Sequence, residues 1–253
     1  MKSEIWSRYG YAILGHVLLI GLWQAAVEFG RIPSFVLPTP MATLRAFTEP
    51  NYRWGENVLA TTTEIFGGYA LAVLAAIAIA VIFSWFRRVE MLVMPVLVSL
   101  NMIPKVALGP LVIVWFKYGI GPNIVITFAI CFFPIVLTTA RGLHEVEPDL
   151  LDLARTMQAS RWQTFAKIQL PNSLPYVFSG MKVSAVLAVA GAVVGEFLGS
   201  DRGLGYLMAQ VQVNLDTAAM FMALILITLI GVVLYGLVLL LERLVVPRDA
   251  RRD

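Results

Sequence analysis

Two ionisable side chains, Lys105 and Glu196, lie within or at the end of long runs of apolar residues. Charges at membrane depth are costly, and they usually face a cavity or one another. One interpretation places Lys105 and Glu196 side by side near an outer gate, either paired or lining a path for a solute. The alternative is that each reaches the lipid headgroups alone. Met102 and Ile103 are candidates to line the same path, although such residues more often face lipid or pack internally.

The residue types that build enzyme or metal sites are scattered. Cys131 is the single cysteine and is expected to act as a small hydrophobe, while His16 and His144 each stand apart from other metal-ligating residues. The sequence has neither HExxH nor GxSxG. It also has no GxxxxGK[ST] phosphate loop, so hydrolysis of ATP by this route is excluded. We therefore predict no catalytic residue, no metal site and no cofactor bound by this chain.

Composition indicates that most of the chain lies in lipid. Of the 253 residues, 59% are hydrophobic and 14% are charged, whereas soluble domains average about 45–50% apolar and about 25% charged. The net charge of +3 does not indicate nucleic-acid binding, because the charges cluster between uncharged runs and form no basic face. A single soluble domain and a disordered chain are both disfavoured, and the lipid bilayer is the first expected partner.

The uncharged runs predict six membrane-spanning helices, since a helix needs about 20 mostly apolar residues to cross the hydrocarbon layer. The expected spans are residues 9–29, 62–86, 91–116, 120–140, 175–199 and 217–241. Pro104, Lys105 and Pro110 interrupt the third span, which suggests a segment buried in protein or lining a cavity. The predicted fold class is all-α, a single polytopic domain with an external loop at 30–60 and a cytoplasmic loop at 141–174.

Orientation follows from Lys and Arg, which are enriched on the cytoplasmic side of membrane proteins. With both termini in the cytoplasm, twelve of the 19 Lys and Arg residues lie inside and five outside, while Lys105 and Lys182 lie within spans. The opposite orientation would invert this ratio. Lys182 lies near the start of the fifth span, and we expect its ammonium group to extend toward the cytoplasmic interface.

Glycine recurs at every fourth position in the fifth span, at Gly191, Gly195 and Gly199. Small residues at this spacing let helix backbones approach closely. Two interpretations stay open. The stripe packs against another helix of the same chain, or it forms a moving contact near a dimer axis or pore.

The cytoplasmic loop is predicted to form two short amphipathic helices. Pro148 suits a first helical turn, and the acidic residues around it favour the positive end of a helix. Ser160 and Gln163 have the spacing of a capping box, which predicts the start of a second helix, and Leu170 with Pro171 predicts its end. The apolar stripe of the first helix is Leu150, Leu153, Ala154 and Met157. Such helices either lie in the groove of a partner or pack against the ends of the spans.

Residues 152–171, DLARTMQASRWQTFAKIQLP, resemble the cytoplasmic loop of ABC importer permeases, the inner-membrane subunits of binding-protein-dependent transport. The family pattern is Glu-Ala-Ala, three residues, Gly, nine residues, then Ile-x-Leu-Pro. This chain matches the end fully and the start at Ala154, with Asp152 as an acidic substitute. Gln158 replaces the glycine, and there it either continues the helix or adopts a left-handed turn at some cost.

The resemblance extends over nearly the whole chain, through FVLPTPMATL, IPKVALGPLVIVWFKYGIG, ASRWQTF and GEFLGSDRGLGYLM. These segments look like those of the subgroup that imports nitrate, sulfonates, taurine, and thiamine or riboflavin precursors. A type I ABC importer permease fold in a bacterial-type inner membrane is implied. A coupling helix at residues 151–160 is also implied, with Arg155 or Arg161 at its rim. The implied coupling residues are Asp152, Leu153, Ala154, Arg155, Met157, Gln158, Ala159, Ser160 and Arg161.

The partners implied by the resemblance are cytoplasmic ABC ATPase subunits, which bind ATP and Mg²⁺, and an external solute-binding protein. A second permease copy, most simply in a homodimer, is also implied. A self-contained secondary carrier or channel is the alternative function, although carriers usually show an internal repeat that is not clear in this sequence. Whether transport needs a cytosolic ATPase separates the two. The sequence does not specify the solute.

Overall fold

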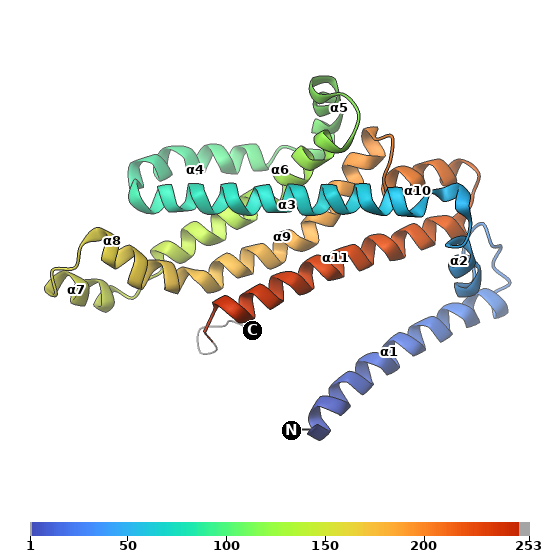
Figure 1. Cartoon of the computed structure of the whole chain (residues 1–253), viewed down its shortest axis with the longest axis horizontal. Coiled ribbons are helices and arrows are strands. Elements are labelled where there is room, and N and C mark those ends of the chain that lie inside the picture. The colour runs from blue at the N-terminus through green and yellow to red at the C-terminus, as the bar shows by residue number, and fades with distance from the viewer. Residues whose placement is uncertain (1, 248–253) are drawn as a thin grey trace.

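The computed structural model describes residues 2–247, which are helical with no β-strand among them (Figure 1). The all-α prediction is confirmed. A 3₁₀ turn (Pro50–Tyr52) precedes α3, and a π-helical turn (Phe165–Gln169) joins α8 to α9. The α-helices are α1 (Lys2–Phe29), α2 (Pro40–Ala46), α3 (Trp54–Trp85), α4 (Arg87–Asn101), α5 (Lys105–Phe116), α6 (Ile120–His144), α7 (Pro148–Thr156), α8 (Arg161–Thr164), α9 (Leu170–Gly199), α10 (Leu204–Val213) and α11 (Thr217–Val245).

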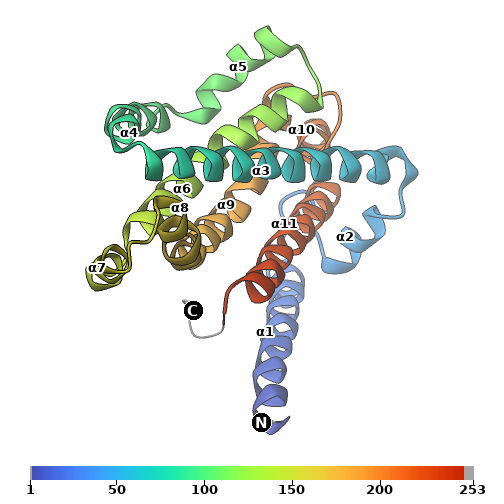
Figure 2. The ribbon, with the colours of Figure 1, turned by 60° about the vertical axis from the view of Figure 1, so that its left-hand side comes forward.

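Helices α3, α6 and α9 form the centre of the bundle, and α11 packs against α9 (Figure 2). Their contact faces carry small side chains. In α3, Ala72, Ala76 and Ala80 have no exposed surface, and the same holds for Ala188 and Ala192 in α9. Small side chains let helix backbones approach closely, which matters in lipid because van der Waals packing, and not exclusion from water, drives helices together.

The outward faces of the long helices are apolar, as expected for contact with lipid. Leu74 in α3 is 69% exposed and Val232 in α11 is 61% exposed. Among the described residues, four helical segments are long and apolar enough to cross a membrane: Pro50–Trp85, Ile120–His144, Arg161–Gly199 and Thr217–Val245. The number rises to five if α4 and α5 together count as one span, and Ile13–Phe29 in α1 is a shorter apolar helix.

The third predicted span, residues 91–116, is interrupted as the sequence indicates, because α4 and α5 meet at an angle of 86°. Pro104 has no backbone N–H and disfavours helical geometry in the residue before it, so α4 ends at Asn101 and α5 begins at Lys105. The Lys105 ammonium donates to the Asn101 backbone carbonyl and, at 2.8 Å, to Asn101 Oδ1. A cation in this position stabilises the negative end of α4.

Leu170 and Pro171 do not end a helix, contrary to the prediction, because the helical segment runs on from Arg161 to Gly199. The π-helical turn explains why. It lets the Leu170 N–H bond the Phe165 carbonyl, five residues back. Pro171 then occupies the first turn of α9, where the missing N–H of a proline costs little.

The bundle has two ends, which we name after the short helices that mark them. At the α7–α8 end, α3, α6 and α11 finish and α9 begins, and segment 145–169 projects beyond them (Figure 1). At the α2–α10 end, α3, α6 and α11 begin. α3 starts at Trp54, inside the predicted external loop 30–60, which also holds α2. Tyr52 donates a hydrogen bond to Asp216 Oδ2 and so joins the start of α3 to the start of α11.

Candidate functional site

Segment 145–169 contains the residues predicted to contact an ATPase. Helix α7 begins at Pro148, as predicted. The predicted capping box is confirmed: the Gln163 N–H donates to Ser160 Oγ at 3.2 Å, and the Ser160 N–H donates to Gln163 Oε1 at 2.8 Å. Both helices of the segment therefore start where the sequence indicates.

The prediction of one helix over residues 151–160 is wrong, because α7 ends at Thr156. Gln158 has a left-handed φ of 54°. Its N–H bonds the Arg155 carbonyl at 2.9 Å, and the next N–H along the chain bonds the Ala154 carbonyl at 2.9 Å. These two bonds form a Schellman motif, in which the left-handed position usually carries glycine. Gln158 thus forms the turn between α7 and α8, which a glycine would form at a lower cost in conformational free energy.

Replacing Gln158 with glycine is expected to stabilise the folded chain by about 1 kcal/mol. A side chain in the left-handed region costs about 1–2 kcal/mol, and the greater freedom of glycine in the unfolded chain offsets part of the gain. The melting temperature of the purified chain in detergent measures the effect. Gln169→Gly is the matched control, because Gln169 has a helical φ of −66° and glycine should destabilise there. A lower melting temperature for Gln158→Gly would contradict the prediction.

Aromatic side chains fix α8 to the end of α3. The ring of Trp85, the last residue of α3, lies 6.1 Å from that of Trp162 and 5.8 Å from that of Phe165, measured between centroids. Phe165 is buried. Segment 145–169 is therefore joined to α3 through these rings and to α9 through the π-helical turn.

The apolar stripe of α7 divides into buried and exposed parts. Ala154 is buried against the chain itself, whereas Leu153 is 55% exposed and Met157 is 73% exposed. A groove of about 350 Å³ runs between the two arms of the segment, lined by Leu150, Leu153, Ala154, Met157, Ala159, Gln163, Thr164, Lys167 and Ile168. The predicted packing residues therefore differ in exposure. Leu153 and Met157 face outward, whereas Ala154 packs inside the segment.

The predicted polar members of the segment are exposed at its surface. Arg155 donates to Asp152 Oδ1 at 2.8 Å, and both side chains are well exposed. Gln158 and Ser160 are exposed as well. Arg155 and Arg161 line a second cleft, of about 550 Å³, which reaches Trp85. An exposed apolar face with cations beside it is suited to contact another protein.

The suggested pairing of Lys105 with Glu196 is absent from the described structure. Lys105 bonds Asn101, as shown above, and Glu196 of α9 is buried against α3 and α10. Glu196 Oε1 accepts from Thr61 Oγ1 at 2.5 Å, and Oε2 accepts from the Gly205 N–H. Met102 is 77% exposed and Ile103 is 39% exposed at the break between α4 and α5. The proposal that these four residues line a path stays a prediction.

A second buried carboxyl, Glu64, lies beside Glu196, and sequence reasoning missed it. Glu64 is in α3, and its Oε1 accepts from Asn123 Nδ2 of α6 at 2.9 Å. The sequence feature that could have identified Glu64 is its position as a charged residue in the run TTTEIFGGY, within the predicted second span. The surrounding network also holds Asn57, whose Oδ1 accepts from the Gly203 N–H at 2.8 Å. Polar groups from α3, α6 and α9 thus meet the start of α10.

The extension of Lys182 toward the cytoplasmic interface stays a prediction, and its ammonium group has a partner within the protein. Its ammonium forms an ion pair with Glu242 of α11 at 3.0 Å, and the two side chains are 21% and 8% exposed. A nearby carboxylate offers a lysine a better partner than distant water when both lie between packed helices. The pair joins α9 to α11.

The glycine stripe faces α6 of the same chain. A Cβ on Gly191 would lie 3.0 Å from Thr127 Cα, and a Cβ on Gly195 would lie 2.6 Å from Asn123 Oδ1. Gly199 is buried at the end of α9. The α6–α9 contact is reinforced by the Ser184 hydroxyl, which donates to the Cys131 carbonyl at 2.9 Å.

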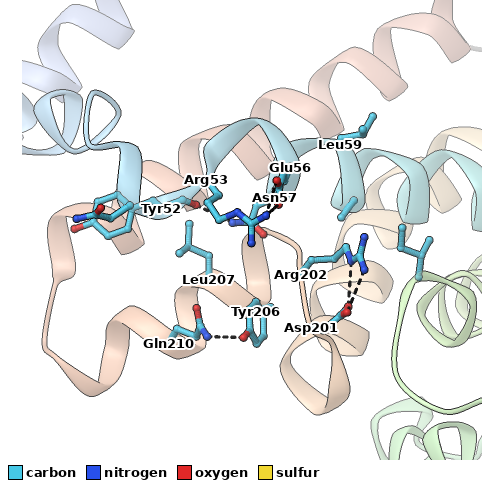
Figure 3. A pocket seen from close by; sticks show the side chains of 13 residues that line it. Tyr52, Arg53, Glu56, Asn57, Leu59, Asp201, Arg202, Tyr206, Leu207 and Gln210 are labelled. Carbon is cyan, nitrogen blue, oxygen red and sulfur yellow. Dashed lines mark hydrogen bonds and ion pairs between the residues drawn. The ribbon is translucent and has the colours of Figure 1, made fainter.

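A charged cleft of about 540 Å³ opens at the α2–α10 end (Figure 3). Arg53 pairs with Glu56 at 2.6 Å on one wall, and Arg202 pairs with Asp201 at 3.1 Å on the other. Arg202 lowers the pKa of Asp201 by hydrogen bonding, so this carboxylate stays ionised. Tyr206 and Gln210 of α10 also line this cleft (Figure 3).

Comparisons with known proteins agree on one family. Residues 68–247 match the family described as binding-protein-dependent transport system inner membrane component. The chain is 34% identical over 237 residues to the riboflavin transport system permease protein RibX of Chloroflexus aurantiacus, covering 92% of this chain and 88% of that protein. It is 30% identical over 232 residues to the formylaminopyrimidine transport permease protein ThiX of Halalkalibacterium halodurans, covering 91% and 92%.

A solved structure has the same fold. The inward-facing MetNI methionine ABC transporter matches with a TM-score of 0.64 and 19% sequence identity, over 78% of this chain and 95% of that chain. The shared fold is the finding here, since the identity is low.

Proposed function

Because this chain belongs to the binding-protein-dependent transport system inner membrane components, as the permease subunit of an ATP-driven importer, we propose that α7 couples it to the ATPase. The observation that carries this proposal is the exposed face of Leu153 and Met157, which lies beyond the ends of the long apolar helices. An apolar face outside the lipid is costly in water unless a partner covers it. Nothing in the comparisons favours a self-contained carrier.

The proposed coupling is mechanical. ATP and Mg²⁺ bind the separate ATPase subunits, whose closure moves α7. The aromatic contacts of Trp85 with Trp162 and Phe165 pass this displacement to α3, and the continuous helix from Arg161 passes it to α9. Long helices that move as units convert such a displacement into opening at the far end.

The proposed topology has six membrane segments: α1, α3, the broken pair α4–α5, α6, α9 and α11. The α7–α8 end faces the cytoplasm, as does each terminus, because this orientation places twelve Lys and Arg residues inside against five outside. One chain supplies one coupling helix, so the transporter contains two permease copies, most simply as a homodimer. The charged cleft beside α10 then faces the external binding protein.

The solute class that we propose to test first is a riboflavin- or pyrimidine-type heterocycle. The support comes from the names of the two relatives, which transport riboflavin and formylaminopyrimidine. The external binding protein delivers the solute, so titration of that protein with both compound classes is the direct measurement. Binding of a sulfonate or nitrate in preference to both would contradict this choice.

Uptake into proteoliposomes tests the proposed coupling. Vesicles with the permease, the ATPase and the loaded binding protein are expected to accumulate solute only when ATP reaches the ATPase side. Vesicles with the permease alone are the control and should show no uptake above leakage. Accumulation by the permease alone, driven by an ion gradient, would identify a secondary carrier.

A further inference from the structure

The carboxyl groups of Glu64 and Glu196 meet inside the protein at the α2–α10 end. They are 0% and 1% exposed. Thr61, one turn before Glu64 on α3, donates to Glu196 Oε1 at 2.5 Å. Asn123, which donates to Glu64 Oε1 at 2.9 Å, lies against the backbone of Gly195, the residue before Glu196. In the part of the chain that the structure describes, no Lys, Arg or His forms an ion pair with either group. Two ionised carboxylates cannot hydrogen bond one another, because both are acceptors only. Their charges would also repel strongly in such a poorly solvated place.

Hydrogen-bond donors are distributed unequally between the two groups. Glu196 accepts from Thr61 Oγ1 at 2.5 Å and from the Gly205 N–H in the first turn of α10, the positive end of that helix. Glu64 accepts from Asn123 Nδ2 through Oε1, while its Oε2 is buried with no N–H or O–H directed at it. Glu196 therefore has the surroundings of an anion, and Glu64 has those of a neutral acid.

We propose that Glu64 and Glu196 form a proton-binding site, in which a proton on Glu64 Oε2 is donated to the Glu196 carboxylate. The proton comes from water, and no bond between heavy atoms is made or broken. It gives the unpartnered oxygen of Glu64 a hydrogen bond and halves the buried charge. This hydrogen bond joins α3 to α9, and Glu196 in turn bonds the start of α10. We call this linkage of the three helices the clamp. This inference does not rest on the transport function.

A metal cation is the competing occupant of the same place. Hard cations in proteins take about six or more oxygen ligands, and the surroundings are too crowded to supply them. Asn123 Oδ1 is directed at the backbone of Gly195, where a Cβ would lie only 2.6 Å away. The backbone of Gly205 lies equally close to Glu196, because a Cβ on Gly205 would be 2.7 Å from Glu196 Oε2. A proton needs no such shell of ligands.

Infrared spectroscopy of the full chain in lipid nanodiscs tests the proposal directly. At neutral pH the wild-type chain is expected to show the C=O stretching band of one buried, protonated carboxylic acid. Glu64→Gln should remove the band, because the amide N–H replaces the O–H as donor to Glu196. Glu242→Gln is the matched control: Glu242 is also buried in a spanning helix, but it forms an ion pair with Lys182, so the band should stay.

A second measurement follows the clamp itself. The folded chain holds this proton, whereas an unfolded glutamate loses it above about pH 4. The melting temperature of the wild-type chain should therefore fall as the pH rises from there, until Glu64 also ionises in the folded chain. Glu64→Gln should lose this part of the fall, and Glu242→Gln should keep it. Asp201 in the α9–α10 loop is a further charged group near the pair, and it is paired with Arg202, which lowers its pKa. Its charge stays constant over this range.

Three results would overturn the proposal. The first is a wild-type spectrum without the acid band at neutral pH. The second is a band that Glu64→Gln leaves unchanged in a folded chain. The third is a melting temperature that falls on removal of Na⁺ or Ca²⁺ and recovers when the ion returns, which would identify a cation. If Glu64→Gln does not fold, isotope labelling of the glutamate carboxyl carbons decides on the wild-type chain, because a band that fails to shift is not a glutamic acid.

Discussion

Leu153→Lys is expected to weaken binding of the ATPase to this permease by roughly thirty-fold or more and to abolish ATP-driven uptake. Leu153 is 55% exposed on α7, so its apolar surface is available to a partner. Burial of a leucine side chain contributes about 1.5–3 kcal/mol, and residues at the centre of an interface commonly cost about 2 kcal/mol or more when changed. Lysine adds a charge that the partner groove must desolvate.

The fold of the permease should survive this substitution. Lysine is a good helix former, and a cation in the last turns of α7 interacts favourably with the negative end of the helix. Thr156→Lys is the matched control, because it adds the same charge to the same helix on the polar face beside Arg155 and Asp152. Pull-down affinity for the ATPase, with the melting temperature of each variant, measures the effect. Equal loss in both variants would mean that added charge, and not the apolar face, weakens binding.

The local chemistry of the coupling segment could be predicted from the sequence, but its three-dimensional path could not. Pro148 and the Ser160–Gln163 capping box mark helix starts through interactions within one turn, and both appear where expected. The end of α7 depends on Gln158 adopting a left-handed φ, which residue type alone disfavours. The family pattern, with glycine at this position, held the necessary information.

Buried polar groups were predicted least well, because their partners are distant in sequence. Lys105 and Glu196 were singled out as costly groups, and each has a different partner: Asn101 is four residues from Lys105 in the sequence, whereas Thr61 is on another helix from Glu196. Lys182 likewise paired with Glu242. The free-energy cost of burying a charged side chain can be judged from that residue and its neighbours in the sequence. The identity of the partner depends on which helix faces are brought together, and composition does not determine that.

Gly191→Leu is expected to destabilise the folded chain by about 3 kcal/mol or more and to abolish transport. A Cβ at this position already lies 3.0 Å from the Thr127 Cα and 3.4 Å from Ile130 Cδ1. The first contact is with backbone, which cannot rotate away as a side chain can. Overpacking of a well-packed core costs about 1–3 kcal/mol, and three further carbon atoms must fit here. α6 and α9 have to separate, which also weakens the Ser184–Cys131 hydrogen bond.

Gly236→Leu in α11 is the matched control, since nothing lies within 4 Å of a Cβ there. It changes the same residue type on a spanning helix and should leave the melting temperature close to that of the wild type. Melting temperature and yield of folded chain, compared with uptake in vesicles, separate the two interpretations of the glycine stripe. A Gly191→Leu chain that melts normally but fails to transport would favour a moving contact near a dimer axis. A chain that neither folds nor transports supports packing of α9 on α6, because the close approach of these two helices is then a requirement of the fold.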